Sequence, residues 1–426
     1  MDNNTNSKKL IHTDQGKKWL SQFEPLDQEL AITVANSLTL ISHSEFRRKL
    51  ESKLQQLASE IDGSVALYAV REIKKQENNN LYEEKPIPFF EQAIHSDNGN
   101  SVNAVDDTAD LGSEAIVAQI IRQISKSNPN KYLNHPALEV IRKDKCNSII
   151  FVDDFIGSGR RVRDFLESFR LEPTVVSWLS GKQINFHVVT YSGTEDGIKY
   201  VACHKSKPTL HIYRDAPTFD SIYWSLQKKR DVKNLCEKYG RIANKRRKNM
   251  WWGYNKGMAA IVFEHGCPNN TPAILWEPNF KGSGWVGLFP NRTVSSATAS
   301  VFPSEIARGD PIQVLIDAGQ SKLARSGALL RRGKMGQIIL TALGLIAKGQ
   351  RKRSTLSFAT GLNIESCDHL IEKCIKWQFV TVQRRITPKG LAELNTAKKM
   401  KMVEGKPLDI GSDYYYPNQL RETSYD

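Results

Sequence analysis

The sequence predicts an α/β fold with a mostly parallel sheet and flanking helices, an N-terminal helical section and a C-terminal winged helix-turn-helix. Apolar runs rich in β-branched residues occur at 148–154, 184–193 and 259–266, and helical patterns separate them, which is typical of buried parallel strands. In the N-terminal part of the chain, apolar residues recur at helical spacing. After residue 335, three short helical patterns precede a small hairpin pattern, as in a winged helix.

In chain order, these patterns divide the sequence into five parts. They are the helical section at 1–60, the α/β domain at 61–295, a connecting segment at 296–334, the winged helix-turn-helix at 335–402 and a tail at 403–426. Residues 1–9 are expected to be disordered, and a polar stretch at 75–111 is expected to form a mobile insertion or lid. A helix is expected after that stretch, with Ser113 as its N-cap.

Composition limits the kind of protein and the kind of partner. Lys and Arg outnumber Asp and Glu by 60 to 46, and the formal net charge of +14 favours nucleic acid or a phosphorylated ligand as partner. The six cysteines form no CxxC pair and no Cys/His cluster, which predicts reduced thiols in the core. No apolar run reaches the ~18 residues of a membrane span. We therefore expect no membrane partner and a cytoplasmic location.

Two adjacent carboxylates end the apolar run at 148–154. Four apolar residues lead the chain out of the sheet at its carboxyl edge, where α/β proteins bind their ligands. Asp153 and Asp154 follow at once. Carboxylates accept hydrogen bonds from vicinal hydroxyl groups, as an acidic residue does for a ribose. The pair is therefore a candidate site for sugar hydroxyls.

A small-residue loop comes next and suits a phosphate. Gly157, Ser158 and Gly159 allow tight backbone turns, and a helix is expected to begin near Arg160. Such a helix points its free N–H groups and its positive dipole end into the loop. Arg160 and Arg161 add two cations that can contact a phosphate. Together with the acidic pair, the loop describes a site for a ribose 5-phosphate.

This order of apolar strand, Asp-Asp, small-residue loop and helix resembles the ribose-phosphate signature of type I phosphoribosyltransferases. The resemblance implies that Asp153 and Asp154 hold the ribose hydroxyls, that residues 157–159 bind the 5-phosphate, and that the α/β domain is phosphoribosyltransferase-like. It also implies a Mg²⁺ ion if the donor is phosphoribosyl pyrophosphate or a similar nucleotide. Family loops usually end in Gly-Thr or similar small residues. Here Arg160 and Arg161 stand instead, and a guanidinium there either contacts the phosphate or crowds the site.

Further polar residues are expected at the same pocket. Arg71 and Glu72 follow the strand-like run "VALYAV", where the pyrophosphate loop of the family would lie, and an ordinary ion pair is the alternative reading. His265 is a candidate general base or a structural histidine. Its segment, 253–276, looks like one in a divergent phosphoribosyltransferase-like group associated with bacterial conflict systems. Other residues that follow a strand or head a helix complete the set: Ser113, Glu114, Glu264, Asn269 and Asn270.

The winged helix-turn-helix is basic. Lys and Arg far outnumber Asp and Glu between residues 331 and 401, which favours contact with a phosphate backbone. The expected contacts come from a loop, the third helix and the wing: Arg351, Lys352, Arg353, Lys373, Arg384 and Arg385. Glu365 and Asp368 at the start of the third helix would repel DNA at the groove. A winged helix that serves dimerisation or docking is the alternative.

A ribose-phosphate domain joined to a winged helix is similar to the effector of certain bacterial retrons. That resemblance implies a toxic anti-phage effector that transfers or cleaves a ribosyl group on a nucleotide or nucleic acid. Its partners would be a reverse transcriptase and its msDNA, an RNA–DNA hybrid molecule, which hold it inactive. Two alternatives stay open: a DNA-binding regulator that senses ribose 5-phosphate compounds without turnover, and an assembly protein whose winged helix only docks onto a ribonucleoprotein.

Overall fold

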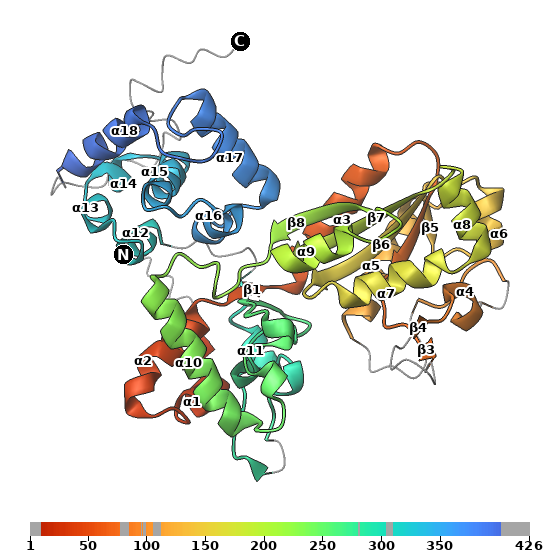
Figure 1. Cartoon of the computed structure of the whole chain (residues 1–426), viewed down its shortest axis with the longest axis horizontal. Helices are drawn as coiled ribbons and strands as arrows, with labels where there is room; N and C mark the ends of the chain where they lie inside the picture. The colour runs from red at the N-terminus through yellow and green to blue at the C-terminus, as the bar shows by residue number, and fades with distance from the viewer. Residues whose placement is uncertain are drawn as a thin grey trace. The chain divides into compact units, whose positions relative to one another are not determined.

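The computed structural model describes residues 10–76, 85–94, 96, 99–104, 112–279, 282–303 and 310–401. The chain divides into two compact units (Figure 1): unit 1 comprises residues 1–218 and 232–305, and unit 2 comprises residues 219–231 and 306–426. The expectations for residues 1–9, for the tail at 403–426 and for much of the insertion at 75–111 lie outside the described residues. In the described part of the chain, no helix is both long and apolar enough to cross a membrane.

The centre of unit 1 is a parallel sheet that, within the described residues, has five strands in the order β5-β2-β6-β7-β8. The strands are β2 (Val65–Ala69), β5 (Tyr132–Asn134), β6 (Ser148–Ile156), β7 (Asn185–Gly193) and β8 (Thr209–Asp215). Every pairing between neighbours is parallel. All residues of β2 and β6 are buried, which explains their unbroken apolar runs. The predicted α/β fold with a mostly parallel sheet is confirmed.

The strands differ from the sequence prediction in several places. The run at 259–266 contains β9 (Ile261–Phe263), but β9 pairs with β1 (Thr39–Ile41) in a separate two-stranded sheet and not with the main sheet. The edge strands of the main sheet are β5 and β8, and the pattern of apolar residues revealed neither of them. The edge strand β8 shows why. Most side chains of this edge strand, "TLHIYRD", are only partly buried, and its sequence therefore mixes apolar and polar residues.

Helices cover both faces of the main sheet. They are α3 (His43–Ser59), α5 (Ser113–Ser127), α6 (Leu138–Lys143), α7 (Arg160–Arg170), α8 (Pro173–Ser180) and α9 (Glu195–Ala202). Phe151 of β6 packs on α7, with its ring centroid 5.7 Å from that of Phe165 and 4.9 Å from that of Phe169. Side chains alternate along a strand, so Ile150 and Val152 point to the opposite face, where α5 packs on β2 and β6.

The described part of the insertion adds to the α7 face. β3 (Lys75–Gln76) pairs antiparallel with β4 (Lys85–Pro86), and α4 (Phe89–Gln92) follows. Phe89 stacks on Phe169 at 4.3 Å between ring centroids. α4 therefore contributes to the aromatic core under α7.

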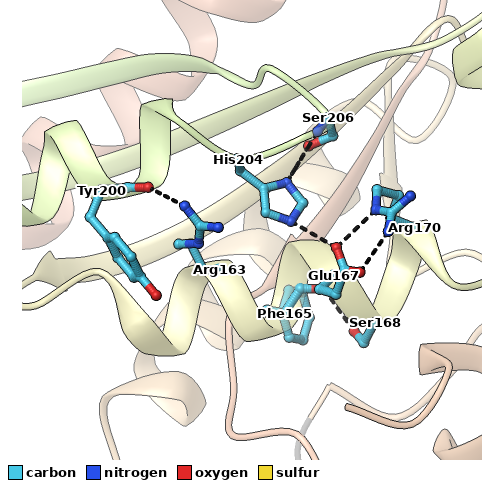
Figure 2. A network of polar contacts seen from close by, with 8 residues as sticks. All are labelled: Arg163, Phe165, Glu167, Ser168, Arg170, Tyr200, His204 and Ser206. Atoms are coloured by element: carbon cyan, nitrogen blue, oxygen red, sulfur yellow. Dashed lines mark hydrogen bonds and ion pairs between the residues drawn. The ribbon is translucent and has the colours of Figure 1, made fainter. Parts of the chain in front are cut away.

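A polar network fixes α7 further along the helix (Figure 2). Glu167 accepts hydrogen bonds from the Nε and Nη2 atoms of Arg170, at 2.8 and 2.7 Å. Burial lowers the pKa of His204, and its contact with Glu167 opposes the fall. The backbone N–H of Ser206 donates to Nδ1 at 3.3 Å, so Nδ1 is an acceptor, also for the Ser206 hydroxyl (2.8 Å), and Nε2 donates to Glu167 (3.0 Å). The network ties α7 to the loop after α9 and so fixes the helix whose first turn carries Arg160 and Arg161.

The N-terminal helices pack on the last part of unit 1. α1 (Asp14–Leu20) and α2 (Pro25–Asn36) lie against residues 232–243 of α10 (Leu226–Ala243), and α11 (Ser296–Ala299) closes the unit. Trp19 donates from Nε1 to the carbonyl oxygen of Ile274 at 2.8 Å. The Phe23 ring lies 4.4 Å from the Tyr239 ring and 5.3 Å from the Trp285 ring, between centroids.

Unit 2 has the helices of a winged helix-turn-helix and further helices before them. These are α12 (Pro311–Asp317), α13 (Ser321–Ala324), α14 (Ala328–Arg331), α15 (Lys334–Ala347), α16 (Arg353–Thr360), α17 (Ile364–Lys376) and α18 (Pro388–Lys399). An antiparallel bridge between Val380 and Ile386 closes the wing. The segment expected to connect the domains contributes α12 to α14 to the same core, in which Leu315 and Leu329 lie with Leu343 and Leu356.

Candidate functional site

The acidic pair lies inside unit 1, near the carboxyl end of β6. Asp153 is 2% exposed and Asp154 is 7% exposed. Asp153 stands opposite Thr190 of β7, so the ladder extends past the acidic pair, and β6 continues to Ile156. Two adjacent buried carboxylates need compensation, because a charge without a partner is costly in the interior.

Two basic side chains supply that compensation. Arg161 donates from Nη2 to Oδ1 of Asp153 at 2.5 Å and to Oδ1 of Asp154 at 3.2 Å. His265 Nε2 lies 3.0 Å from Oδ2 of Asp154. The His265 side chain is 3% exposed, and among the described residues no hydrogen bond reaches its buried Nδ1 atom. The structure thus brings the predicted residues Asp153, Asp154, Arg161 and His265 together.

The pKa values of the two carboxyl groups move apart. Burial raises the pKa of Asp153 well above its ordinary value; the charge of Arg161 opposes the rise and that of Asp154 adds to it. Burial also disfavours ionisation of Asp154, but the hydrogen bond with His265 and the charge of Arg161 outweigh it and lower the pKa. Asp154 is therefore the member of the pair that ionises first.

The glycine loop is held against its neighbours. Gly159 has φ 77° and caps α7, a conformation that favours glycine. A Cβ on Gly157 would lie 1.9 Å from Oδ1 of Asn270, so only glycine fits without a shift. Thr194 donates from Oγ1 to the carbonyl oxygen of Gly157 at 2.5 Å, and the backbone N–H of Arg160 donates to Ser158 Oγ at 3.4 Å. The loop and the first N–H groups of α7 form a frame suited to an anion.

The other predicted pocket residues differ in their placement. Asn270 abuts the glycine loop, and its Nδ2 donates to the carbonyl oxygen of Tyr254 at 3.0 Å, while the Asn269 carbonyl accepts from the Tyr254 N–H. Glu264 instead accepts from the backbone N–H of His43 at 2.7 Å, which places its carboxylate at the start of α3.

The start of α5 also differs from expectation. The prediction that Ser113 caps this helix is wrong, because Gly112 is the N-cap and Ser113 is the first helical residue. Glu114 lies close enough to Arg161 for its charge to help raise the pKa of the guanidinium. Glu114 thus belongs to the charged surroundings of the acidic pair.

Arg71 and Glu72 follow the neighbouring strand β2, and they differ in burial. The backbone N–H of Val70 donates to the Val152 carbonyl at 2.8 Å, so Arg71 leaves β2 at the sheet edge where Asp153 lies. Arg71 is buried, with its guanidinium carbon 5.4 Å from the Phe89 ring centroid, whereas Glu72 is exposed.

Sequence reasoning missed two residues that shape this site. His135 is buried, accepts from the backbone N–H of Ala69 at 2.9 Å, and has its pKa lowered to about 3 by burial and by the charge of Arg71. Nothing in the local sequence marks this histidine. Thr194 was detectable, since a threonine between the β7 run and "EDG" is a typical N-cap, and its Oγ1 accepts from Gly197 at 3.1 Å.

The candidate nucleic-acid residues of unit 2 fall into two groups. Arg353 lies 3.1 Å and Arg384 3.9 Å from the Asp368 carboxylate, so this acid of α17 is partly neutralised by cations of the module itself. The remaining predicted contacts are exposed: Arg351, Lys352, Lys373 and Arg385. Glu365 is exposed and stands in the first turn of α17.

Comparisons with known proteins match both units. A family model described as PRTase-CE matches residues 17–291, and one described as wHTH-PRTase associated matches residues 340–422. The first range contains the acidic pair, the glycine loop and His265. No curated protein and no solved structure matches the chain. The predicted phosphoribosyltransferase-like domain with a C-terminal winged helix is confirmed by these two matches.

Proposed function

Because the chain belongs to the PRTase-CE family, we propose that unit 1 binds a 5-phosphorylated ribosyl compound and transfers or cleaves its ribosyl group. One observation carries the proposal: a buried acidic pair at the end of a parallel strand is followed directly by a glycine loop that caps α7. Ligands of α/β sheets bind at such strand ends, and phosphates bind at such helix starts.

The proposed reaction occurs at the anomeric carbon. Asp153 and Asp154 orient the ribose hydroxyls, the frame of residues 157–159 binds the 5-phosphate, and Arg71 balances the charge of a diphosphate leaving group. The bond to the leaving group weakens first, and the ring passes through an oxocarbenium-like state before the acceptor attacks. Because the acidic pair is buried, bulk water has little access to the reacting carbon. Attack by a bound acceptor is therefore favoured over attack by bulk water.

A Mg²⁺ ion fits this site when the donor is phosphoribosyl pyrophosphate. Among the described residues, the Oδ2 atom of Asp153 is buried and receives no hydrogen bond, and carboxylate oxygens suit this ion. Asp153 and Asp154 are the residues that would face it, and its charge would neutralise the diphosphate. In the described part of the chain, no cluster of three or more His, Cys, Asp or Glu residues forms a metal site by itself.

The wider role we propose is that of a retron effector in anti-phage defence, acting in the cytoplasm. Reverse transcriptase and msDNA would hold it inactive, and unit 2 would contact nucleic acid. The support consists of two family matches in one chain and the exposed cations of unit 2. A ligand-sensing DNA-binding regulator is the second candidate. The contact of Arg161 with both carboxylates favours it, since a neutralised site suits a binding switch.

Expression in bacterial cells tests the proposal. The chain is induced as wild type, as Asp153→Asn/Asp154→Asn, and as Asp144→Asn, a control at an exposed carboxylate. Nucleotide pools and labelled nucleic acid are profiled by mass spectrometry. Loss of a nucleotide or appearance of a ribosyl product with wild type and control, but not with the double variant, is the expected result. Unchanged pools and nucleic acid in all three, with the proteins folded, would favour the regulator.

A further inference from the structure

Arg161 covers the oxygens that the proposed function assigns to ribose. Its Nη2 atom bonds Oδ1 of both acidic residues, and His265 bonds Oδ2 of Asp154. The side chains of Asp153 and Asp154 are only 2% and 10% exposed with Arg161 in place. Ribose hydroxyls cannot reach these oxygens while the guanidinium lies over them. The site as it stands is therefore closed to a sugar.

The guanidinium itself is not enclosed. The Arg161 side chain is 29% exposed, and among the described residues no hydrogen bond engages its Nε or Nη1 atoms. Arg161 is the second residue of α7 and follows the loop of residues 157–159 by two positions. A long, flexible side chain at this place can turn from the strand end to an anion bound at the helix start.

Removing Arg161 from the acidic pair leaves a charge that needs a new partner. Breaking a buried ion pair is strongly unfavourable when one charge stays uncompensated. A ligand that has both ribose hydroxyls and a phosphate offers a new partner to the carboxylates and another to the guanidinium. Its hydroxyls donate to the carboxylates, and its phosphate accepts charge-assisted hydrogen bonds from the guanidinium. A sugar without a phosphate has no anionic group that could bind the displaced guanidinium.

We propose that Arg161 exchanges partners on binding, leaving Asp153 and Asp154 for the 5-phosphate, and that this exchange selects phosphorylated ribosyl compounds over unphosphorylated ones. The inference rests on the proposed function, since it concerns the same site. Arg161 is in this view a specificity residue, which neutralises the free site and contacts the bound ligand.

Arg163 provides a matched control. It stands two residues after Arg161 in α7, but its Nη1 atom donates to the carbonyl oxygen of Tyr200 at 2.8 Å and not to the acidic pair. Arg163→Ala removes an equal charge from the same helix without uncovering the acidic pair. A general effect of positive charge would follow both substitutions, whereas partner exchange follows Arg161 alone.

The test is a calorimetric titration of the full chain with ribose 5-phosphate and with ribose. For wild type, Arg161→Ala, Arg161→Lys and Arg163→Ala, the ratio of the Kd for ribose to the Kd for ribose 5-phosphate is compared. Arg161→Ala should lower this ratio about tenfold or more, because no guanidinium remains to bind the phosphate. It should also tighten the binding of ribose, because the acids are uncovered. Arg163→Ala should keep the wild-type ratio, and Arg161→Lys should fall between the two.

Each of the other outcomes contradicts either the exchange of partners by Arg161 or the proposed function. An unchanged ratio in folded Arg161→Ala, or an equal fall in Arg163→Ala, contradicts the exchange but leaves ribose 5-phosphate binding in place. If Arg161→Ala weakens the binding of both ligands equally, Arg161 only stabilises the structure of the site and does not select the ligand. If Arg161→Ala does not fold, Arg161→Lys decides, since its shorter arm must still lower the ratio. Absence of binding to the wild type contradicts the proposed function itself.

Discussion

His265 illustrates how burial constrains the role of a single residue. Its Nε2 atom lies 3.0 Å from Asp154, and its Nδ1 atom is buried, so the ring serves the carboxylate and does not face an open space. We expect His265→Gln, which keeps an N–H donor, to retain affinity for ribose 5-phosphate. His265→Leu should weaken it about tenfold, because the hydrogen bond that lowers the pKa of Asp154 is removed.

Titration of ribose 5-phosphate measures the affinity, and ribosyl turnover is measured beside it. If His265→Gln binds normally but loses turnover, the histidine acts as a general base. If His265→Leu binds like wild type, the hydrogen bond to Asp154 has no bearing on the ligand. The structure favours the positioning role over the general base.

His135 makes the stability of unit 1 depend on pH. Its pKa is lowered to about 3, against about 6.5 in an unfolded chain. Below pH 6.5 the unfolded chain binds a proton that the folded chain does not, so the free energy of unfolding falls as the pH drops. His135 accounts for about 2 kcal/mol of this loss at pH 5. Denaturant unfolding at pH 7.5 and pH 5 measures it.

The matched variant is His135→Gln, whose carbonyl oxygen can still accept from the Ala69 N–H but does not titrate. Other histidines with lowered pKa values, such as His187, titrate alike in both proteins, and the difference between them isolates His135. Wild type should lose more stability between the two pH values than the variant. Equal losses would contradict the neutral, buried state of this ring.

Among the elements, the loop between β6 and α7 leaves no room for a methyl group at Gly157. Gly157→Ala should abolish binding of ribose 5-phosphate and destabilise the protein by about 1–3 kcal/mol, because the new Cβ meets Asn270. Gly181→Ala is the control: Gly181 ends α8 with φ −78°, and its nearest atom to a new Cβ is 3.3 Å away.

Thermal unfolding and ligand titration of both variants measure these effects. If the loop binds the phosphate, the Gly157 variant should lose affinity and stability while the Gly181 variant changes little. Should Gly157→Ala bind ribose 5-phosphate as wild type does, the loop would not be the phosphate site. The comparison thus separates the proposed site from a general sensitivity of unit 1 to alanine.

For the whole molecule, the exposed cations of unit 2 determine whether the winged helix binds nucleic acid or only docks. Lys373→Glu/Arg385→Glu should weaken duplex binding and lower the slope of log K against log salt by about 1 for each phosphate that the variant no longer neutralises. Lys182→Glu, at an exposed residue of unit 1, is the control. Fluorescence anisotropy at several salt concentrations gives the slope. Equal slopes for wild type and double variant would favour a docking module.

The sequence predicts what depends on local pattern and misses what depends on distant contacts. Continuous apolar runs reveal β6 and β7, and the Asp-Asp-loop order reveals the acidic pair and the glycine loop. The pairing of β9 with β1 joins segments more than 200 residues apart, which periodicity cannot show. The reach of Arg161 back to the acidic pair likewise follows from the turn into α7 and not from the spacing of the residues.

Calorimetric titration of ribose 5-phosphate into the purified full chain tests directly whether the acidic pair belongs to a ribose-phosphate site. Wild type and Asp144→Asn should show saturable binding. Asp153→Asn/Asp154→Asn, which keeps the shape of the pair but not its charge, should bind no ligand while remaining folded by circular dichroism. Undiminished binding to that double variant would contradict a ribose-phosphate site at the acidic pair.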